Sequence, residues 1–175
     1  MNSLNKVKKS PKTGSECVDD HIITMELIKR KARQSIIKKT STLPKSMIDW
    51  VYENTHGGDV QRGPLRTSPS FILKSSKKLK EATMFLFFFR LEFKNFPDDG
   101  FSKNVINAYD RYKKFVSIFN QSNSSTITKI NISEAWQIAT FNIEKSLFLV
   151  KCQYCKSSKI YIVSEPFHAC PVCKN

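Results

Sequence analysis

Four cysteines near the C-terminus form two C-x-x-C pairs, Cys152–Cys155 and Cys170–Cys173, and 14 residues lie between the pairs. Each pair can present two thiolates from one tight turn, and two such turns supply the tetrahedral four-sulfur set that Zn²⁺ prefers in structural sites. We therefore predict one Zn²⁺ per chain, bound by Cys152, Cys155, Cys170 and Cys173. Structural zinc contributes apparent binding free energies of about 10 to 16 kcal/mol at neutral pH, which can stabilise a short module that has little apolar core.

Two disulfide bonds are the alternative for the same cysteines. The first residues, 1–9, lack the apolar core of a signal peptide, and the apolar run Met84–Phe89 is far too short to cross a bilayer. We therefore expect a cytoplasmic protein without membrane association, where thiols stay reduced and available to a metal. His168 is a weaker candidate ligand because the sulfur set is already complete, and Cys17 is interpreted as a bystander.

Catalysis by the predicted zinc is disfavoured by its ligands. A catalytic zinc needs an open coordination position for water or substrate, and four thiolates leave none. The sequence also lacks the H-E-x-x-H pattern of metalloproteases, the His-x-Glu of zinc deaminases and a glycine-rich phosphate loop. We expect that the protein is not an enzyme.

The charge balance indicates a polyanionic partner. The chain of 175 residues has 29 Lys and Arg against 15 Asp and Glu, a formal charge of +14 and a pI near 9.7. A membrane surface would attract the same charge, but no segment pairs a basic face with a strongly apolar opposite face, as interfacial helices do. Nucleic acid is therefore the favoured partner.

The chain divides into three parts, and the predicted fold is mainly α. Residues 1–19 are polar and basic and are expected to form a flexible N-terminal arm. Residues 20–150 contain several helical patterns and are predicted to form a DNA-binding and partner-binding domain. Residues 151–175 form a zinc-ribbon-like module with four cysteines, and a strand is expected at Lys159–Val163 between the two pairs.

Two helices at the start of the helical domain are compatible with a helix-turn-helix. The first is predicted to begin at an Asp20 cap and to continue through Ile37, and the second covers Leu43–Tyr52 with Thr42 as cap. Ordinary helix packing is the alternative, since such pairs are common. The candidate DNA-binding residues are the basic side chains of these helices and of the loop over about 55–70 that follows them, namely Lys29, Arg30, Lys31, Arg33, Lys45, Arg62 and Arg66.

A third helix, Ser76–Asn95, has no polar face over Met84–Phe89. A helix that is apolar all round must be buried all round, either in its own core or against another chain. We favour a partner subunit. Two further helices are predicted, with Ser102 and Ser133 as their caps.

The order of these features over residues 20–175 resembles the FlhC family of bacterial flagellar transcriptional activators. No single element is specific, but their co-occurrence in this order is. The resemblance is carried by Met25–Ile28 with Ala32-Arg33, the Leu43–Tyr52 helix, Gly63-Pro64 to Ser70-Phe71, Ala108–Tyr112, Ala135-Trp136 and the two C-x-x-C pairs.

The resemblance implies a DNA-binding subunit that forms a hetero-oligomer with FlhD, activates flagellar operons and contacts RNA polymerase. It places the zinc cysteines of the family at Cys152, Cys155, Cys170 and Cys173, whereas no DNA-contact residue is carried over. The alternative function is a zinc-bearing adaptor that binds proteins and meets nucleic acid only through nonspecific charge. Discrimination between DNA sequences would separate the two.

Overall fold

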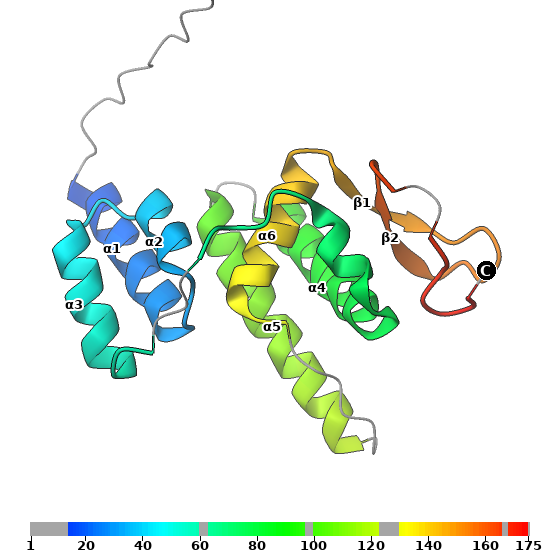
Figure 1. The fold of residues 1–175 in the computed structure, drawn as a ribbon, viewed down its shortest axis with the longest axis horizontal. Helices are drawn as coiled ribbons and strands as arrows, with labels where there is room; N and C mark the ends of the chain where they lie inside the picture. The colour runs from blue at the N-terminus through cyan, green and yellow to red at the C-terminus, as the bar shows by residue number, and fades with distance from the viewer. Residues whose placement is uncertain (1–13, 60–62, 97–99, 123–129, 166–167, 175) are drawn as a thin grey trace, which may run out of the picture.

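The computed structural model describes residues 14–59, 63–96, 100–122, 130–165 and 168–174. Its described part is mainly helical and ends in a two-stranded hairpin followed by a second cysteine turn, and the four cysteines of the hairpin and this turn cluster together, which confirms the predicted fold class (Figure 1). The elements in chain order are α1 (Gly14–Lys29), α2 (Gln34–Thr40), α3 (Lys45–His56), the 3₁₀ helix η1 (Pro69–Lys74), α4 (Ser76–Asn95), α5 (Gly100–Ser122), α6 (Ile132–Ile143), β1 (Leu147–Lys151) and β2 (Ser158–Ile162).

The single helix predicted from Asp20 through Ile37 is wrong at both ends. Its backbone is already helical from Gly14, inside the predicted flexible arm, whose residues 1–13 lie outside the described part. The helix stops after Lys29 because Lys31 adopts a left-handed conformation (φ 55°). The Lys31 and Ala32 amides then donate to the carbonyl oxygens of Ile28 and Leu27, at 2.8 and 3.0 Å. This is the Schellman pattern that closes helices, and it lets α2 fold back on α1.

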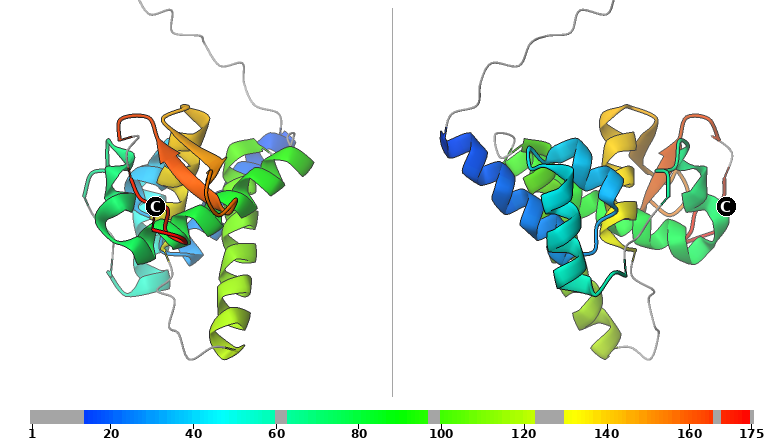
Figure 2. Two further views of the ribbon diagram at one scale, coloured as in Figure 1. Left: turned by 90° about the vertical axis from the view of Figure 1, so that its right-hand side faces the viewer. Right: turned by 60° about the vertical axis from the view of Figure 1, so that its left-hand side comes forward.

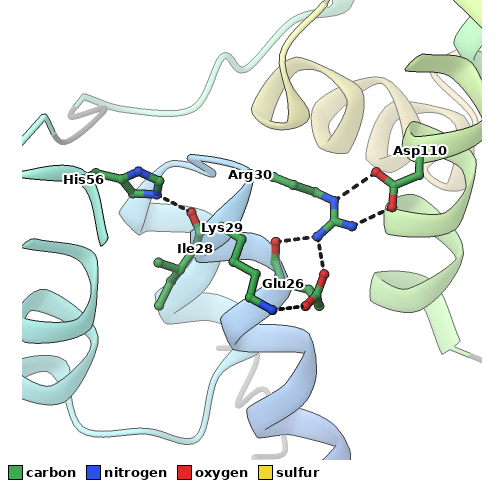
Figure 3. A network of polar contacts seen from close by, with 6 residues as sticks. All are labelled: Glu26, Ile28, Lys29, Arg30, His56 and Asp110. Carbon is green, nitrogen blue, oxygen red and sulfur yellow. Dashed lines mark hydrogen bonds and ion pairs between the residues drawn. The ribbon is translucent and has the colours of Figure 1, made fainter. Parts of the chain in front are cut away.

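Helices α1, α2 and α3 pack around a small apolar core and form one three-helix unit (Figure 1). Helix α3 begins directly after Pro44 and not at a Thr42 cap, and Gly57 (φ 59°) ends it. His56 Nε2 lies 2.6 Å from the Ile28 carbonyl oxygen, so the end of α3 is fixed to the end of α1 (Figure 3). The buried side chains shared by the three helices are Leu27, Ile28, Ile36, Ile37, Ile48 and Tyr52.

Helices α4, α5 and α6 form the second layer of the helical part, and the C-terminal half of α5 extends beyond its neighbours (Figures 1 and 2). The predicted bounds of α4 are confirmed, although Ser75 is its cap. The cap predicted at Ser102 is wrong, because α5 already begins at Gly100. The cap predicted at Ser133 is also wrong, because Asn131 caps α6 through a capping box with Glu134.

Arg30 joins the two helical layers. Its guanidinium donates two hydrogen bonds to the Asp110 carboxylate of α5, at 2.5 and 3.1 Å, and a third to the Glu26 carboxylate, at 2.5 Å (Figure 3). Only 17% of the Arg30 side chain is exposed. A bidentate pair of this kind fixes orientation as well as distance, so it holds the three-helix unit against α5.

The C-terminal hairpin shares the core of the helical part. Strand β1 pairs with β2 in antiparallel register from Leu147 opposite Ile162 to Lys151 opposite Ser158. Leu147, Ile160 and Ile162 are buried and belong to the same apolar cluster as the helices. The predicted strand between the cysteine pairs is thus confirmed as β2. Among the described helices, none combines the length and apolar character that a membrane span requires.

A carboxyl group is buried at the start of α4. Glu81 is 4% exposed, and its Oε1 has no hydrogen-bond partner among the described residues. Burial raises the pKa of Glu81 to about 7; the Glu134 carboxylate acts in the same direction, while Lys77 and Lys78 oppose it. The protonated form is therefore favoured by folding.

We predict that Glu81→Gln stabilises the protein at pH 8 by about 1 to 3 kcal/mol in the free energy of unfolding and leaves it nearly unchanged at pH 5. Because folding raises the pKa, the stability contributed by protonated Glu81 is full below pH 4.5 and is lost as the pH rises through about 7. Urea unfolding at the two pH values measures the difference. Glu53→Gln, at an exposed position of α3, is the control. An equal effect of Glu81→Gln at both pH values would contradict the assignment.

Candidate metal centre and nucleic-acid face

The four C-terminal cysteines meet at one point. Their Sγ atoms all lie within 4.8 Å of one another, with 3.7 Å between Cys152 and Cys173 and 3.8 Å between Cys155 and Cys170. A tetrahedral ion with metal–sulfur bonds of about 2.3 Å places its sulfurs about 3.8 Å apart. The geometry of the thiols thus fits one metal ion, as the spacing of the two pairs predicted.

Each cysteine pair is held by the same turn. The carbonyl oxygen of Cys152 accepts a hydrogen bond from the Lys156 amide at 3.0 Å, and that of Cys170 accepts one from the Lys174 amide at 2.8 Å. Both lysines are left-handed, with φ of 59° and 63°. The turns therefore curl each pair toward one centre, and they do so with lysine where glycine would be freer.

The surroundings of the thiols favour the thiolate form that binds metal. The Ser157 hydroxyl lies 2.9 Å from Cys155 Sγ, and this contact lowers the pKa of Cys155. Burial raises the pKa of Cys170, but hydrogen bonds from the Cys173 and Val172 amides and from Ser157 outweigh it and lower the pKa to about 6. Thiolates pre-formed in this way lose less affinity to proton competition.

His168 and Cys17 do not belong to this cluster. The ring nitrogens of His168 lie 2.9 and 2.7 Å from the carbonyl oxygens of Glu165 and Ile160, so the backbone holds the ring. Cys17 lies in α1, at the other end of the molecule (Figure 1). His168 is thus held by backbone carbonyl groups, and the interpretation of Cys17 as a bystander stays a prediction.

The basic candidates at the end of α1, Lys29 and the following Arg30, are engaged in ion pairs. Arg30 points at Asp110 and is the structural bridge described above, which leaves its guanidinium no free edge for DNA (Figure 3). Lys29 is exposed, and its ammonium group lies 2.8 Å from the Glu26 carboxylate. Sequence reasoning could not separate the two, because Asp110 is far along the chain.

Two of the candidates after α1, Lys31 and Arg33, contact the loop that follows α3. Lys31 pairs with Asp59 at 2.8 Å, with both groups exposed to solvent, and the Arg33 guanidinium donates to the Pro64 carbonyl oxygen at 2.8 Å. Lys45 is exposed at the first position of α3. Exposed pairs of this kind contribute about 0 to 1 kcal/mol, so Lys31 can exchange its carboxylate for a phosphate at small cost.

The candidate Arg66 has basic neighbours in α2, Lys38 and Lys39. Arg66 is exposed and stacks over the Phe71 ring at 4.6 Å, and it lines a hollow of about 560 Å³ together with Lys39. Lys38, beside Lys39 in the last turn of α2, lies 3.6 Å from the Asp49 carboxylate. Neither lysine was among the predicted DNA-binding candidates, although both directly follow Ile37, the last residue of the predicted first helix. Arg62 lies outside the described residues.

The outer face of α3 is open to solvent. Ile48 and Tyr52 point into the three-helix core, while Trp50 is 65% exposed. The polar side chains beside Trp50 on this face are Ser46, Glu53 and Asn54. The face therefore presents donors, acceptors and one large ring, the types of groups that read base edges in a groove.

The family model described as flagellar transcriptional activator (FlhC) matches residues 10–175. A search of curated proteins found no significant match. The family match covers nearly the whole chain, including the three-helix unit and both cysteine pairs, and it is a family of transcriptional regulators. The chain belongs to the FlhC family of flagellar transcriptional activators.

Proposed function

We propose that this protein is the DNA-binding subunit of a transcriptional activator that acts with an FlhD-like protein on flagellar operons. The observation that carries the proposal is the exposed outer face of α3 in a helix pair whose inner faces are buried. In a helix-turn-helix the second helix lies in the major groove and the first crosses the backbone. Here α3 is the reading helix, and α2 brings Lys38 and Lys39 toward phosphates.

The metal in this proposal is zinc, one ion per chain, and its role is structural. A four-thiolate tetrahedral set is typical of Zn²⁺ and closes its coordination sphere, so the ion ties the hairpin to the second cysteine turn without binding substrate. Family membership supports a regulator acting in the cytoplasm, and contact with RNA polymerase and the absence of catalysis are parts of the same proposal.

The adaptor remains the second candidate because one observation favours it. Of the exposed apolar side chains, several lie on α4 and α5, away from the α3 face, as expected of a protein-binding surface. The two functions differ in sequence discrimination: an activator prefers its promoter, whereas an adaptor binds all duplexes through charge alone.

Co-expression with the FlhD-like protein of the same genome, followed by footprinting on genomic DNA, tests the proposal. A stable complex that protects discrete sites upstream of flagellar genes is the expected result. A complex that forms but protects no preferred sites would favour the adaptor, and failure to form a complex would remove the partnership.

A further inference from the structure

The aromatic helix α4 is divided between two environments. Phe85, Leu86 and Phe89 are fully buried in the core, so part of the apolar surface attributed to a partner belongs to the chain's own interior. Phe87 lies on the other side of the helix and is 51% exposed, and Leu91 and Phe93 are also exposed. This outer face is the part of α4 left to meet another molecule.

Two adjoining hollows flank Phe87, and together they form what we call the α4 groove. One, of about 510 Å³, lies between α4 and the start of the hairpin and is bounded by Leu91, Phe93, Ile143 and Leu149. The other, of about 360 Å³, is bounded by Phe88, Phe115, Pro171 and Val172. Phe87 lines both. Adjacent apolar hollows on a helix face are typical of grooves that accept apolar side chains of a partner segment.

The second cysteine turn forms one wall of this groove. Pro171 and Val172 are the two residues between the metal-binding Cys170 and Cys173, and Val172 is 59% exposed. Their position relative to Phe88 is therefore set by the turn that the metal closes. The hairpin borders the other hollow through Leu149.

The charge around the groove selects the occupant. The charged side chains that line its two hollows are Lys80, Arg90 and Lys94, and no acidic side chain lines either hollow among the described residues. A second copy of this chain would bring the same positive field, since the formal charge is +14. Duplex DNA would meet the charge but not the apolar floor. A protein segment with apolar side chains and acidic flanks satisfies both.

We propose that the α4 groove docks an apolar segment with flanking carboxylates from the partner protein, and that the second cysteine turn is part of the docking site. The inference rests on the proposed partnership with an FlhD-like protein. Phe87 is the central anchor because it lines both hollows, and Lys80, Arg90 and Lys94 attract the carboxylates. The metal then orders a protein interface in addition to the hairpin.

The test measures the affinity of the full chain for the purified FlhD-like protein by calorimetry. Phe87→Asp and Val172→Asp should each weaken binding at least about tenfold, as loss of an interface anchor does, and the milder Phe87→Ala should weaken it in the same direction. Ile22→Asp is the matched control, because Ile22 on α1 is an apolar side chain about as exposed as Phe87, and it should change affinity less than about twofold. Metal content and circular dichroism verify that each variant keeps its fold.

Charge reversal supplies the second arm. Lys80→Glu combined with Lys94→Glu should weaken binding, and the loss should shrink at high salt because the contacts are screened. If the Phe87→Asp, Phe87→Ala and Val172→Asp variants all bind with wild-type affinity, the α4 groove is not the docking site, although the partnership is retained. No binding by the wild type would overturn both. If the chain forms a homodimer that Phe87→Asp dissociates, the occupant of the groove is a second copy. If Phe87→Asp abolishes the DNA affinity of the isolated chain, the occupant is DNA.

Discussion

Cys170→Ser should release the metal ion and unfold the hairpin and cysteine turns over residues 147–174. Removing an outer partner that only orients a metal ligand lowers metal affinity about 10- to 100-fold. Removing a thiolate ligand itself should therefore lower metal affinity more than about 100-fold. Binding free energy of a structural zinc is folding free energy, about 10 to 16 kcal/mol in small modules. Metal analysis of the purified protein and proteolysis of the C-terminal segment measure the two effects.

The same substitution at Cys152, Cys155 or Cys173 should act alike, because the four Sγ atoms share one centre. Cys17→Ser is the matched control and should keep one metal ion per chain, since Cys17 lies in α1. The helical part should keep most of its circular dichroism in every variant. Full metal content in Cys170→Ser, or none in the wild type, would refute the site.

The metal site could be predicted from sequence because its determinants are local. Each cysteine pair is one turn, and the spacing between the pairs leaves room for one strand, which the structure shows as β2. The bounds of α4 were also predictable, because a serine before the helix and Pro97 after it are strong end signals. Local signals of this kind do not depend on how the rest of the chain packs.

The break between α1 and α2 could not be predicted from local signals. The left-handed residue at this break is Lys31, whereas a glycine or asparagine at this position would have predicted a helix end. The predictions of N-caps at Ser102 and Ser133 were wrong for a related reason, since several polar residues near each helix start are equally suitable as the N-cap. The N-terminus of α6 is instead capped by a capping box of Asn131 and Glu134. The Ser133 hydroxyl accepts a hydrogen bond from the Arg33 amide of the neighbouring layer.

Which rings of α4 are buried also depends on tertiary packing and not on local sequence signals. The pattern of Met84–Phe89 showed no polar face, so it could not tell which rings point inward. In the fold, Tyr112 of α5 packs edge-on against Phe85, with ring centroids 6.2 Å apart, and Phe87 remains outside. The prediction that this helix faces a partner is therefore restricted to its outer face, where it stays a proposal.

The second large effect concerns DNA binding by the proposed complex, which should weaken steeply with salt. Each phosphate contact contributes a slope of about −0.9 in log affinity against log salt concentration, so six to ten contacts would cost about 10³- to 10⁵-fold between 50 and 200 mM salt. Arg66→Ala and Lys39→Ala should each reduce the slope by about one unit without changing the preferred sequence. Lys151→Ala, in β1 at the other end of the molecule from α3, is the control and should leave the slope unchanged (Figure 1).

Residues on the outer face of α3 should change which sequence is preferred. If Ser46 or Trp50 contacts a base edge, its replacement by alanine relaxes specificity at one position of the site by about 1 to 3 kcal/mol and leaves the salt slope nearly intact. Arg30→Ala should do neither, because Arg30 is occupied by Asp110. The decisive measurement is a salt titration of the complex on a flagellar promoter and on a scrambled duplex of equal length. Equal affinity for both duplexes at every salt concentration would leave only the electrostatic contribution, and the adaptor would then replace the activator as the function of this protein.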